Sequence, residues 1–492
     1  MANKSVLYNA AGVYNSYKRE MLSNCHVVIQ DGMIEELVRG EINPEDYQKQ
    51  GYETVDMEGQ YLFPGLIDAH AHPFLPQIFS PGFLFSGFRQ WDDQVQLNLD
   101  GLVEQGVVYA QDMGSVDGRG IRYKRMIDRG ELLGPEVDTA LATISVKGGF
   151  PETAPTFPWP ITKVTEGNYI FRGDTEHALD FARRMADQGA NVLKVYFQSH
   201  SVTDYAGPRD GSHTIEDYRR IETPDVDCIT GLIDIAAERR IRVGVHSLCT
   251  EDYETIVRAA NERIAGDQDL YEILRMEHSP AGRLSDDVIG MMAKNQILFS
   301  PTLAIYMQST QEYTQKSIDR LAAMEQGNGS LMPEARKQLT ARLEAGLRLI
   351  EKGGKYKWGE VKAGFIDRRP LLAGYTQATE NVKRCRQAGV KILFGDDMYG
   401  TEQGWDNPII VEMMEMRKAG YSPTDVIHMA TRSNAKILGL SGLGSIEGGN
   451  KASILGLSSD GSQDIKAFRS DNIDTVMIKG KLRKINGRLL KK

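Results

Sequence analysis

Apolar and polar residues alternate along this chain in two ways, one in its middle and another at its ends. In the middle, short apolar runs are separated by stretches in which apolar residues recur at helical spacing. The apolar runs predict eight strands, at 61–67, 107–111, 137–144, 192–197, 241–245, 274–277, 297–303 and 392–394. Helices are predicted at 99–105, 176–188, 227–238, 286–294 and 376–388. Strands that alternate with helices pair in parallel, so the pattern predicts an α/β fold with a closed (β/α)8, TIM-like barrel. An open doubly wound sheet is the alternative.

The two ends consist of short alternating segments broken by turn residues. Strands are predicted at 5–9, 26–30 and 33–39 near the N-terminus, and at 452–457 and 475–479 near the C-terminus. Because both ends share this character around a different middle, we predict a small composite β-sandwich domain built from residues 1–61 and 441–492. The barrel domain then spans residues 62–440.

Two long insertions follow predicted barrel strands. Residues 147–173 follow the third strand and are rich in Gly, Pro and aromatic residues, whereas residues 304–375 follow the seventh and are charged and helix-forming. Active sites of barrels lie at the C-terminal ends of the strands, so we expect both insertions on the active-site face. The second is long enough to act as a cover for the site.

Composition and charge narrow the functional classes. The 492 residues include 58 Lys and Arg against 67 Asp and Glu, a formal net charge of −9, and this acidic balance disfavours nucleic acid or an anionic membrane as partner. Four cysteines without a CxxC pair fit a reducing compartment. The N-terminus lacks the apolar core of a signal peptide, and no apolar run approaches the roughly 20 residues of a membrane helix. We therefore expect a cytoplasmic protein that acts on a small molecule.

Histidines fall at the ends of several predicted strands. His70 and His72 close the segment Pro64-Gly-Leu-Ile-Asp-Ala-His70-Ala-His72, and residues two apart on a strand point to the same side. His246 and His278 follow the fifth and sixth strands. Imidazoles gathered at one end of a barrel can share a metal ion, whereas any one of them alone is more typical of a core or loop histidine.

Two further residues fit a metal site. Asp396 ends the eighth strand and can both ligate a metal and accept a proton from a metal-bound water, while Asp397 fits a turn residue better. Lys194 lies inside an apolar strand, where an unpaired ammonium is costly. Reaction with CO₂ would convert Lys194 to a carbamate able to bridge two metal ions; pairing with a carboxylate is the alternative.

These residues resemble the amidohydrolase superfamily, in the branch that contains imidazolonepropionases and prolidase-like dipeptidases. The resemblance runs from end to end: the hairpin at 31–37, the HxH strand at 63–72, Met276-Glu-His-Ser and Gly444-Ser-Ile-Glu-Gly-Gly match in the family's order. The chain departs from the family at Gly395-Asp396-Asp397, where relatives have Gly-Thr-Asp, and strand alignment favours Asp396 over Asp397 as the ligand.

The resemblance implies a binuclear centre. His70, His72 and Asp396 would hold one divalent ion, His246 and His278 the second, and carbamylated Lys194 would bridge them together with a hydroxide. The ions expected are Zn²⁺ first, with Mn²⁺, Co²⁺ or Fe²⁺ as alternatives, and CO₂ supplies the carbamate. The enzyme would cleave a C–N bond of an amide, N-acyl compound, carbamate or urea, with Asp396 carrying the proton to the leaving nitrogen. A homo-oligomer is expected.

Three other functions compete with this one. A prolidase-like dipeptidase would use the same centre. A mononuclear deaminase on the same fold needs an HxxE pattern, and Glu251 stands at the wrong spacing from His246. A metal-free structural relative would have lost the chemistry, which the six retained positions argue against.

The substrate site is expected to be aromatic. Five phenylalanines, Phe74 among them, occur between residues 74 and 88, and tryptophans fall in segments after strand ends. Candidate substrate contacts are Phe74, Tyr196, Trp159 and His200, with ordinary loop packing as the alternative.

Overall fold

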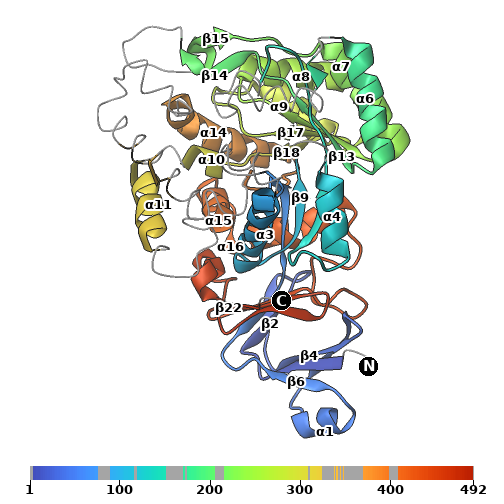
Figure 1. Cartoon of the computed structure of the whole chain (residues 1–492), viewed down its shortest axis with the longest axis vertical. Helices are drawn as coiled ribbons and strands as arrows, with labels where there is room; N and C mark the ends of the chain where they lie inside the picture. The colour runs from blue at the N-terminus through green and yellow to red at the C-terminus, as the bar shows by residue number, and fades with distance from the viewer. Residues whose placement is uncertain are drawn as a thin grey trace.

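The computed structural model describes residues 4–75, 89–115, 119–150, 170–171, 174–205, 215–307, 311–323, 369–397 and 408–490, together with five single positions between 337 and 347. Figure 1 shows two parts along the longest axis, a large helix-covered part and a smaller β-rich part. Both chain termini lie at the β-rich part (Figure 1).

Parallel strands form the centre of the large part. A three-stranded sheet has the order β10-β9-β8, and a six-stranded sheet has the order β12-β11-β13-β16-β17-β18. Their bounds are β8 Leu66–Ala71, β9 Val107–Asp112, β10 Glu136–Thr139, β11 Ile144–Ser145, β12 Ile170–Phe171, β13 Val192–Tyr196, β16 Arg242–His246, β17 Leu274–Glu277 and β18 Leu298–Ser300. Most residues of these strands are buried, and apolar side chains predominate among them, as expected for a parallel sheet covered by helices.

The segment 391–397 lies between the two sheets. On one side the Leu393 N–H donates to the Phe299 carbonyl of β18 (2.9 Å), and on the other the Ala69 N–H of β8 donates to the Phe394 carbonyl (3.0 Å). The side chain of Asn434 adds bonds to Ile67 O (2.8 Å) and Phe394 O (2.7 Å). The arrangement is a TIM-barrel-like α/β fold.

Helices alternate with these strands and bury apolar side chains against them. They are α3 Arg89–Glu104, α4 Gly120–Asp128, α6 Thr175–Gln188, α7 Val226–Arg239, α8 Thr250–Ile264, α9 Asp286–Lys294, α14 Arg369–Ala388 and α15 Pro408–Lys418. The five predicted helices are therefore confirmed in place, and α4, α8 and α15 add to them. One hydrophobic cluster joins the strands and helices of this part.

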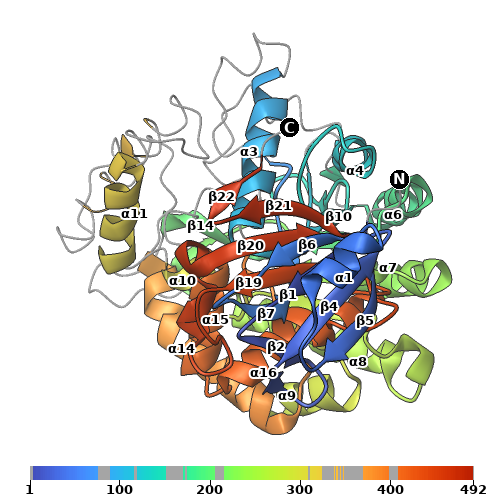
Figure 2. The same cartoon turned by 90° about the horizontal axis from the view of Figure 1, so that it is seen from below.

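Strands from both ends of the chain build the small part. A four-stranded sheet has the order β5-β4-β1-β6, and a seven-stranded sheet has the order β22-β21-β20-β19-β7-β2-β3. Their bounds are β1 Lys4–Tyr8, β2 Gly12–Asn15, β3 Glu20–Leu22, β4 Cys25–Gln30, β5 Met33–Arg39, β6 Glu53–Asp56, β7 Tyr61–Pro64, β19 Ile454–Leu457, β20 Ile473–Ile478, β21 Lys481–Ile485 and β22 Arg488–Leu489. Figure 2 shows the N-terminal strands interleaved with the C-terminal ones. Val27 and Ile29 of one sheet share a hydrophobic cluster with Leu62 and Ile454 of the other.

Three predicted strand boundaries are wrong. Residues 61–64 are β7, which pairs with β19 and β2 in the small part, so the first barrel strand starts at Leu66 and carries His70 itself. The break falls at Gly65, where a Cβ would lie 2.2 Å from a Val108 methyl group, so only glycine allows this close approach. The third strand is interrupted between Thr139 and Ile144, and the eighth has a single bridge, between Ile392 and Phe299.

Much of both predicted insertions lies outside the described residues. Helices α10 Ala304–Met307 and α11 Gln311–Ala323 begin the second insertion, and α14 overlaps its end. A hairpin of β14 His200–Tyr205 and β15 Tyr218–Arg220 follows β13 and was not predicted.

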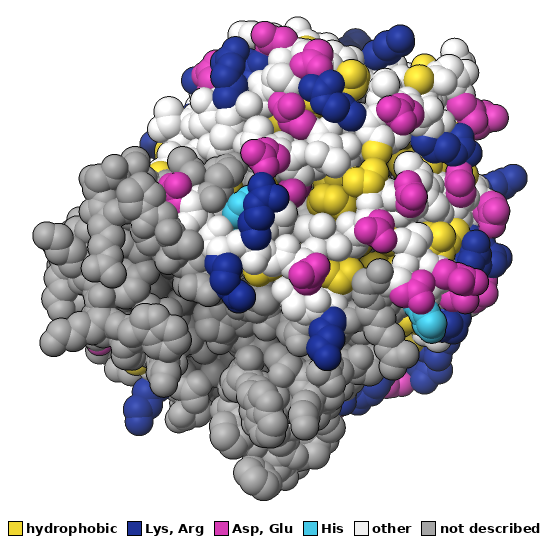
Figure 3. Space-filling view, turned by 90° about the horizontal axis from the view of Figure 1, so that it is seen from above, with side chains coloured by type: hydrophobic (Ala, Val, Ile, Leu, Met, Phe, Trp, Pro, Cys, Tyr) yellow, Lys and Arg dark blue, Asp and Glu magenta, His cyan; other side chains and the backbone are white. Residues whose placement is uncertain are grey.

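Three further features of the described residues concern the surface, the cysteines and the helices. On the face seen in Figure 3, acidic and basic side chains are interspersed with small apolar groups. All four cysteines are buried, and none of them forms a disulfide. None of the described helices has the length and apolar character needed to cross a bilayer.

Candidate metal centre

Four histidines from three strands meet at one end of the barrel-like part. His70 belongs to β8 and His72 follows it, while His246 ends β16 and His278 directly follows β17. All four are at most 8 % exposed. The ring centroids of His246 and His278 are 4.4 Å apart, and those of His70 and His278 are 5.1 Å apart. The structure therefore brings these four histidines close together.

Each imidazole has one nitrogen bonded to an outer partner and the other directed inward. The outer contacts are His70 Nδ1 with Glu277 Oε2 (2.6 Å), His72 Nδ1 with the Gly114 carbonyl (3.2 Å), His246 Nε2 with Gln198 Oε1 (3.0 Å) and His278 Nδ1 with Thr302 Oγ1 (2.8 Å). When a ring donates its N–H outward, the lone pair of its second nitrogen is available for a metal ion. The inward nitrogens of His246 and His278 lie 2.6 Å apart.

Asp397 is the carboxylate among these histidines. Its Oδ1 lies 3.0 Å from His70 Nε2 and 3.1 Å from His72 Nε2, and its Oδ2 lies 3.7 Å from His278 Nδ1. His70, His278 and Asp397 place ligand atoms within 4.8 Å of one another, close enough to hold one ion. Burial would raise the pKa of Asp397, but the neighbouring imidazoles outweigh burial and hold it well below its usual range.

The geometry does not match the expectation that Asp396 is the ligand. Asp396 is fully buried, and its side chain hydrogen-bonds to Asp68 rather than facing the histidines. Burial raises the pKa of Asp68 to about 7, although hydrogen bonds with the His70 backbone and with Asp396 oppose this. Asp397 has a φ of +63°, so the chain leaves extended geometry there and strand alternation no longer decides which side chain points inward.

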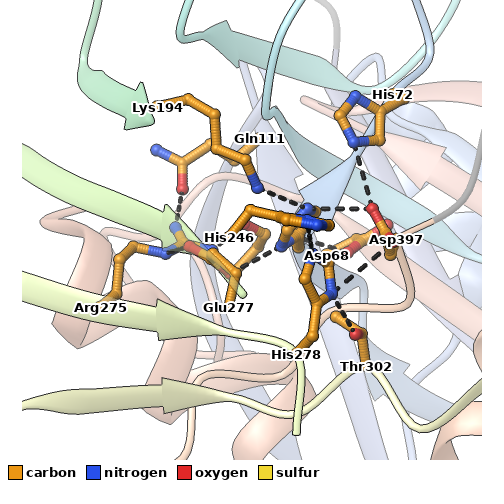
Figure 4. A network of polar contacts seen from close by, with 12 residues as sticks. Asp68, His72, Gln111, Lys194, His246, Arg275, Glu277, His278, Thr302 and Asp397 are labelled. Atoms are coloured by element: carbon orange, nitrogen blue, oxygen red, sulfur yellow. Dashed lines mark hydrogen bonds and ion pairs between the residues drawn. The ribbon is translucent and has the colours of Figure 1, made fainter. Parts of the chain in front are cut away.

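Lys194 reaches the same centre from β13. Its side chain is 1 % exposed, and its Nζ lies 3.4 Å from His70 Nε2. Burial lowers the pKa of Lys194 to about 8, although the carboxylates of Glu277 and Asp397 oppose this. A larger share of this lysine is therefore the neutral amine than for an exposed lysine. Figure 4 shows Lys194, His246, His278 and Asp397 gathered around one centre.

The donor set fits divalent metal. Imidazole and carboxylate are the ligands that Zn²⁺ and similar ions take in proteins. Here the inward nitrogens, the Asp397 oxygens and Lys194 Nζ all meet in a buried place.

Comparison with known proteins agrees with this geometry. The sequence pattern of the amidohydrolase family matches residues 61–483. The chain belongs to the amidohydrolase family. This amidohydrolase is accordingly a hydrolase that acts on carbon–nitrogen bonds, and its family is metal-dependent.

Individual relatives are distant in sequence and similar in fold. Imidazolonepropionase of Clostridium tetani (strain Massachusetts / E88) is 21 % identical over 354 residues, which cover 66 % of this chain and 75 % of that protein. A Xaa-Pro dipeptidase solved with bound methionine superposes with a TM-score of 0.66 at 18 % identity, covering 98 % of this chain and all of the other. Phenylurea hydrolase B superposes with a TM-score of 0.66 at 15 % identity, covering 97 % and 96 % of the two chains.

The predicted substrate contacts of the amidohydrolase lie in different places in the structure. Phe74 is fully buried, 5.3 Å from the Tyr123 ring, and belongs to the hydrophobic core. His200 is 3 % exposed and contacts Ser199 and Cys249. These positions favour packing for both, and Trp159 lies outside the described residues. Tyr196 alone lies beside the centre, with its ring 5.0 Å from that of His246.

Sequence reasoning missed an aromatic residue next to the centre. The Phe150 ring stacks on His246 at 4.8 Å with an interplanar angle of 8°, and it lies 5.3 Å from the Tyr196 ring. Phe150 stands at the start of the aromatic-rich insertion after the third strand, and that composition was the available signal.

The outer partners of the histidines were also missed. Each of these partners follows or ends a strand near one of the four histidines; they are Gln198, Glu277 and Thr302. Their spacing in the sequence gives no indication of this role. For Glu277 the available signal was a charged residue inside a buried strand that also contains Arg275, a signal related to the one that drew attention to Lys194.

Proposed function

We propose that this amidohydrolase uses a binuclear metal centre to hydrolyse a C–N bond in a small apolar or aromatic molecule. His70, His72 and Asp397 would hold one divalent ion, His246 and His278 the second, and Lys194 as its carbamate would bridge them. The observation that carries the proposal is the convergence of four imidazoles whose other nitrogens are all engaged outward. Zn²⁺ is the ion of choice for this donor set, with Mn²⁺, Co²⁺ and Fe²⁺ as alternatives.

The proposed ions and the side chains would contribute different steps of the hydrolysis. When bound, such ions lower the pKa of a water to about 7 and polarise a carbonyl oxygen. Asp397 is held ionised at neutral pH, so it can accept the proton of the attacking water and pass it to the leaving nitrogen. Phe150 and Tyr196 provide an apolar wall beside His246, against which a substrate ring can pack.

The architecture of the site is part of the proposal. We infer that segment 391–397 closes the strands into a (β/α)8 barrel, because it bonds to β18 on one side and β8 on the other. The two terminal sheets would form a β-sandwich with boundaries near residues 61 and 441, since they share one apolar cluster.

The test of this function is a panel of aromatic and aliphatic amides, N-acyl amino acids, dipeptides, carbamates and ureas, assayed on Mn²⁺-, Co²⁺- and Zn²⁺-loaded protein. Appearance of a free amine supports the proposal, together with a carboxylate from an amide, N-acyl amino acid or dipeptide, or with CO₂ from a carbamate or urea. Turnover of dipeptides alone would favour a prolidase-like dipeptidase, which the fold of the Xaa-Pro dipeptidase supports as second candidate. Ammonia release from a ring amine would mark a deaminase.

Replacing Lys194 by Ala should reduce the bound metal from two ions per chain to about one. A carbamate bridge would be lost with the amine, and the neighbouring imidazoles could then retain one ion. Elemental analysis after gel filtration measures the change, and bicarbonate should speed reconstitution of apo wild-type protein but not of the variant. Lys484→Ala is a matched control, because Lys484 is 3 % exposed yet bonds to the carbonyls of Ser470 and of Glu104 at the end of α3, and not to a histidine. Unchanged stoichiometry in Lys194→Ala would contradict the bridge.

Replacing Phe150 by Ala should lower kcat/KM selectively for substrates with an aromatic substituent. Burying about 100 Å² of ring surface at ~25 cal/mol per Å² is worth about 2.5 kcal/mol, so a loss of tenfold or more is expected. A matched pair of substrates that differ only in phenyl against methyl beside the cleaved bond provides the measurement. Equal losses on both substrates would show that Phe150 supports His246 and does not contact the substrate.

A further inference from the structure

Glu277 occupies a distinctive place beside the metal centre. It is the last residue of β17, aligned with His246 of β16 and Ser300 of β18, and it is fully buried. The next residue, His278, leaves the strand with a φ of +66°. Arg275 stands two residues earlier on the same side of the strand and is also fully buried.

Both oxygens of Glu277 are engaged. Oε2 accepts the Nδ1–H of His70 at 2.6 Å and an Nη2–H of Arg275 at 3.2 Å, while Oε1 forms an ion pair with Arg275 Nε. The guanidinium is itself anchored, because Nη2 donates to the Ala69 carbonyl of β8 at 2.8 Å and Nη1 donates to Gln111 of β9. The carboxylate is therefore fixed relative to three strands. Figure 4 shows Arg275 and Glu277 on the side of the centre away from His72.

The neighbouring strand leaves room for this carboxylate. A Cβ at Gly244 of β16 would lie 2.8 Å from Glu277 Oε1 and 2.8 Å from Met113 Cε. Since Arg275 holds the carboxylate in place, any side chain at residue 244 would have to displace the pair.

His70 differs from the other three histidines in the charge of its outer partner. The outer hydrogen-bond partners of His72, His246 and His278 are neutral oxygens, from a backbone carbonyl, an amide and a hydroxyl, although His278 Nδ1 also lies 3.7 Å from Asp397 Oδ2. A carboxylate partner fixes the tautomer, orients the ring and increases the basicity of the opposite nitrogen. That nitrogen, His70 Nε2, faces both Asp397 and Lys194.

We propose that Glu277, fixed by Arg275 and accommodated by Gly244, is a positioning residue that aims His70 Nε2 at the metal and raises the affinity of that site. This inference rests on the proposed metal centre. The guanidinium also keeps the carboxylate away from the ion itself, so Glu277 acts through His70 and not as a ligand.

The test compares apo wild-type protein with Glu277→Gln and Glu415→Gln in a Zn²⁺ titration against a chromophoric chelator. Glu415 is a matched control, because it is 1 % exposed and contacts Tyr375 Oη and Lys418 Nζ rather than a histidine. For Glu277→Gln we expect one of the two ions to bind about ten- to a hundredfold more weakly, which is the usual effect of losing such a partner. The absorption spectrum of the Co²⁺-loaded variant should change as well, whereas Glu415→Gln should match wild type in both measurements.

The outcomes separate this inference from the proposed function. If wild type binds no ion, the metal centre itself is wrong. If wild type binds tightly and folded Glu277→Gln binds equally well with the same Co²⁺ spectrum, the positioning role is overturned. Should Glu277→Gln fail to fold, Gly244→Ala tests the same contact, with weaker metal binding expected and unchanged binding overturning the role.

Discussion

Replacing Asp397 by Asn should reduce kcat by about two to four orders of magnitude, the usual contribution of a positioned proton-transfer group. Asn preserves the size of the side chain and can still occupy the place 3.0 Å from His70 Nε2, but it cannot accept a proton. Substrate should still bind, so KM is expected to change little when the enzyme is assayed at saturating metal. Steady-state kinetics with measured metal content gives both numbers.

The same substitution at Asp396 is the matched control. Asp396 is fully buried, whereas the side chain of Asp397 is 20 % exposed, and Asp396 hydrogen-bonds to Asp68, so Asp396→Asn should affect stability more than turnover. The reverse result, with Asp396→Asn inactive and Asp397→Asn active, would restore the strand alignment that favoured Asp396 from the sequence.

This pair of aspartates marks the limit of sequence reasoning at the site. The sequence predicts that a carboxylate follows the eighth strand, and the structure has one there. Choosing between neighbours requires the backbone angles, and the left-handed conformation at Asp397 reverses the choice that strand alternation suggests. An Asp-Asp dipeptide contains no sign of that angle, because Asp tolerates the left-handed region better than most residues.

The ligand histidines were easier to predict because strand periodicity determines their place. His70 and His72 are two apart on one strand, and His246 and His278 each close an apolar run, so parallel pairing brings them to one end. Lys194 was predictable for a different reason, since a cation inside an apolar strand needs a partner. Glu277 is also a charged residue inside a strand, but its contact with His70 becomes visible only in the folded structure, because β8 and β17 belong to different sheets.

The strands agree with the hydrophobic pattern except where one apolar segment contributes strands to two different sheets. Residues 61–71 read as one apolar stretch, yet β7 pairs with strands of the small part and β8 pairs with β9. Gly65 separates the two strands. Residue 65 must be glycine because it contacts Val108, more than forty positions further along the chain. Local periodicity contains no information about such a contact, so the start of the first barrel strand could not be derived from it.

Removing divalent metal with a chelator should abolish turnover and lower the melting temperature, and Zn²⁺, Mn²⁺ or Co²⁺ should restore both. An ion present at a hundredfold excess over its Kd stabilises the folded state by about 2.7 kcal/mol per site, so the shift should be readily measured. The structural reason is that the inward nitrogens of His246 and His278 lie 2.6 Å apart, and an ion between the donors gives their lone pairs a common partner.

The control for this experiment is the same chelator presaturated with Zn²⁺, which should leave activity and melting temperature unchanged. Protein shown by elemental analysis to be metal-free, yet active and equally stable, would contradict metal-dependent hydrolysis altogether. Loss of activity without any change in melting temperature would instead place the ion away from the four histidines. Those histidines come from β8, β16 and the residue after β17, so an ion bound to them would connect strands that are distant in sequence. An ion held by all of them therefore links its own binding to the stability of the whole strand assembly.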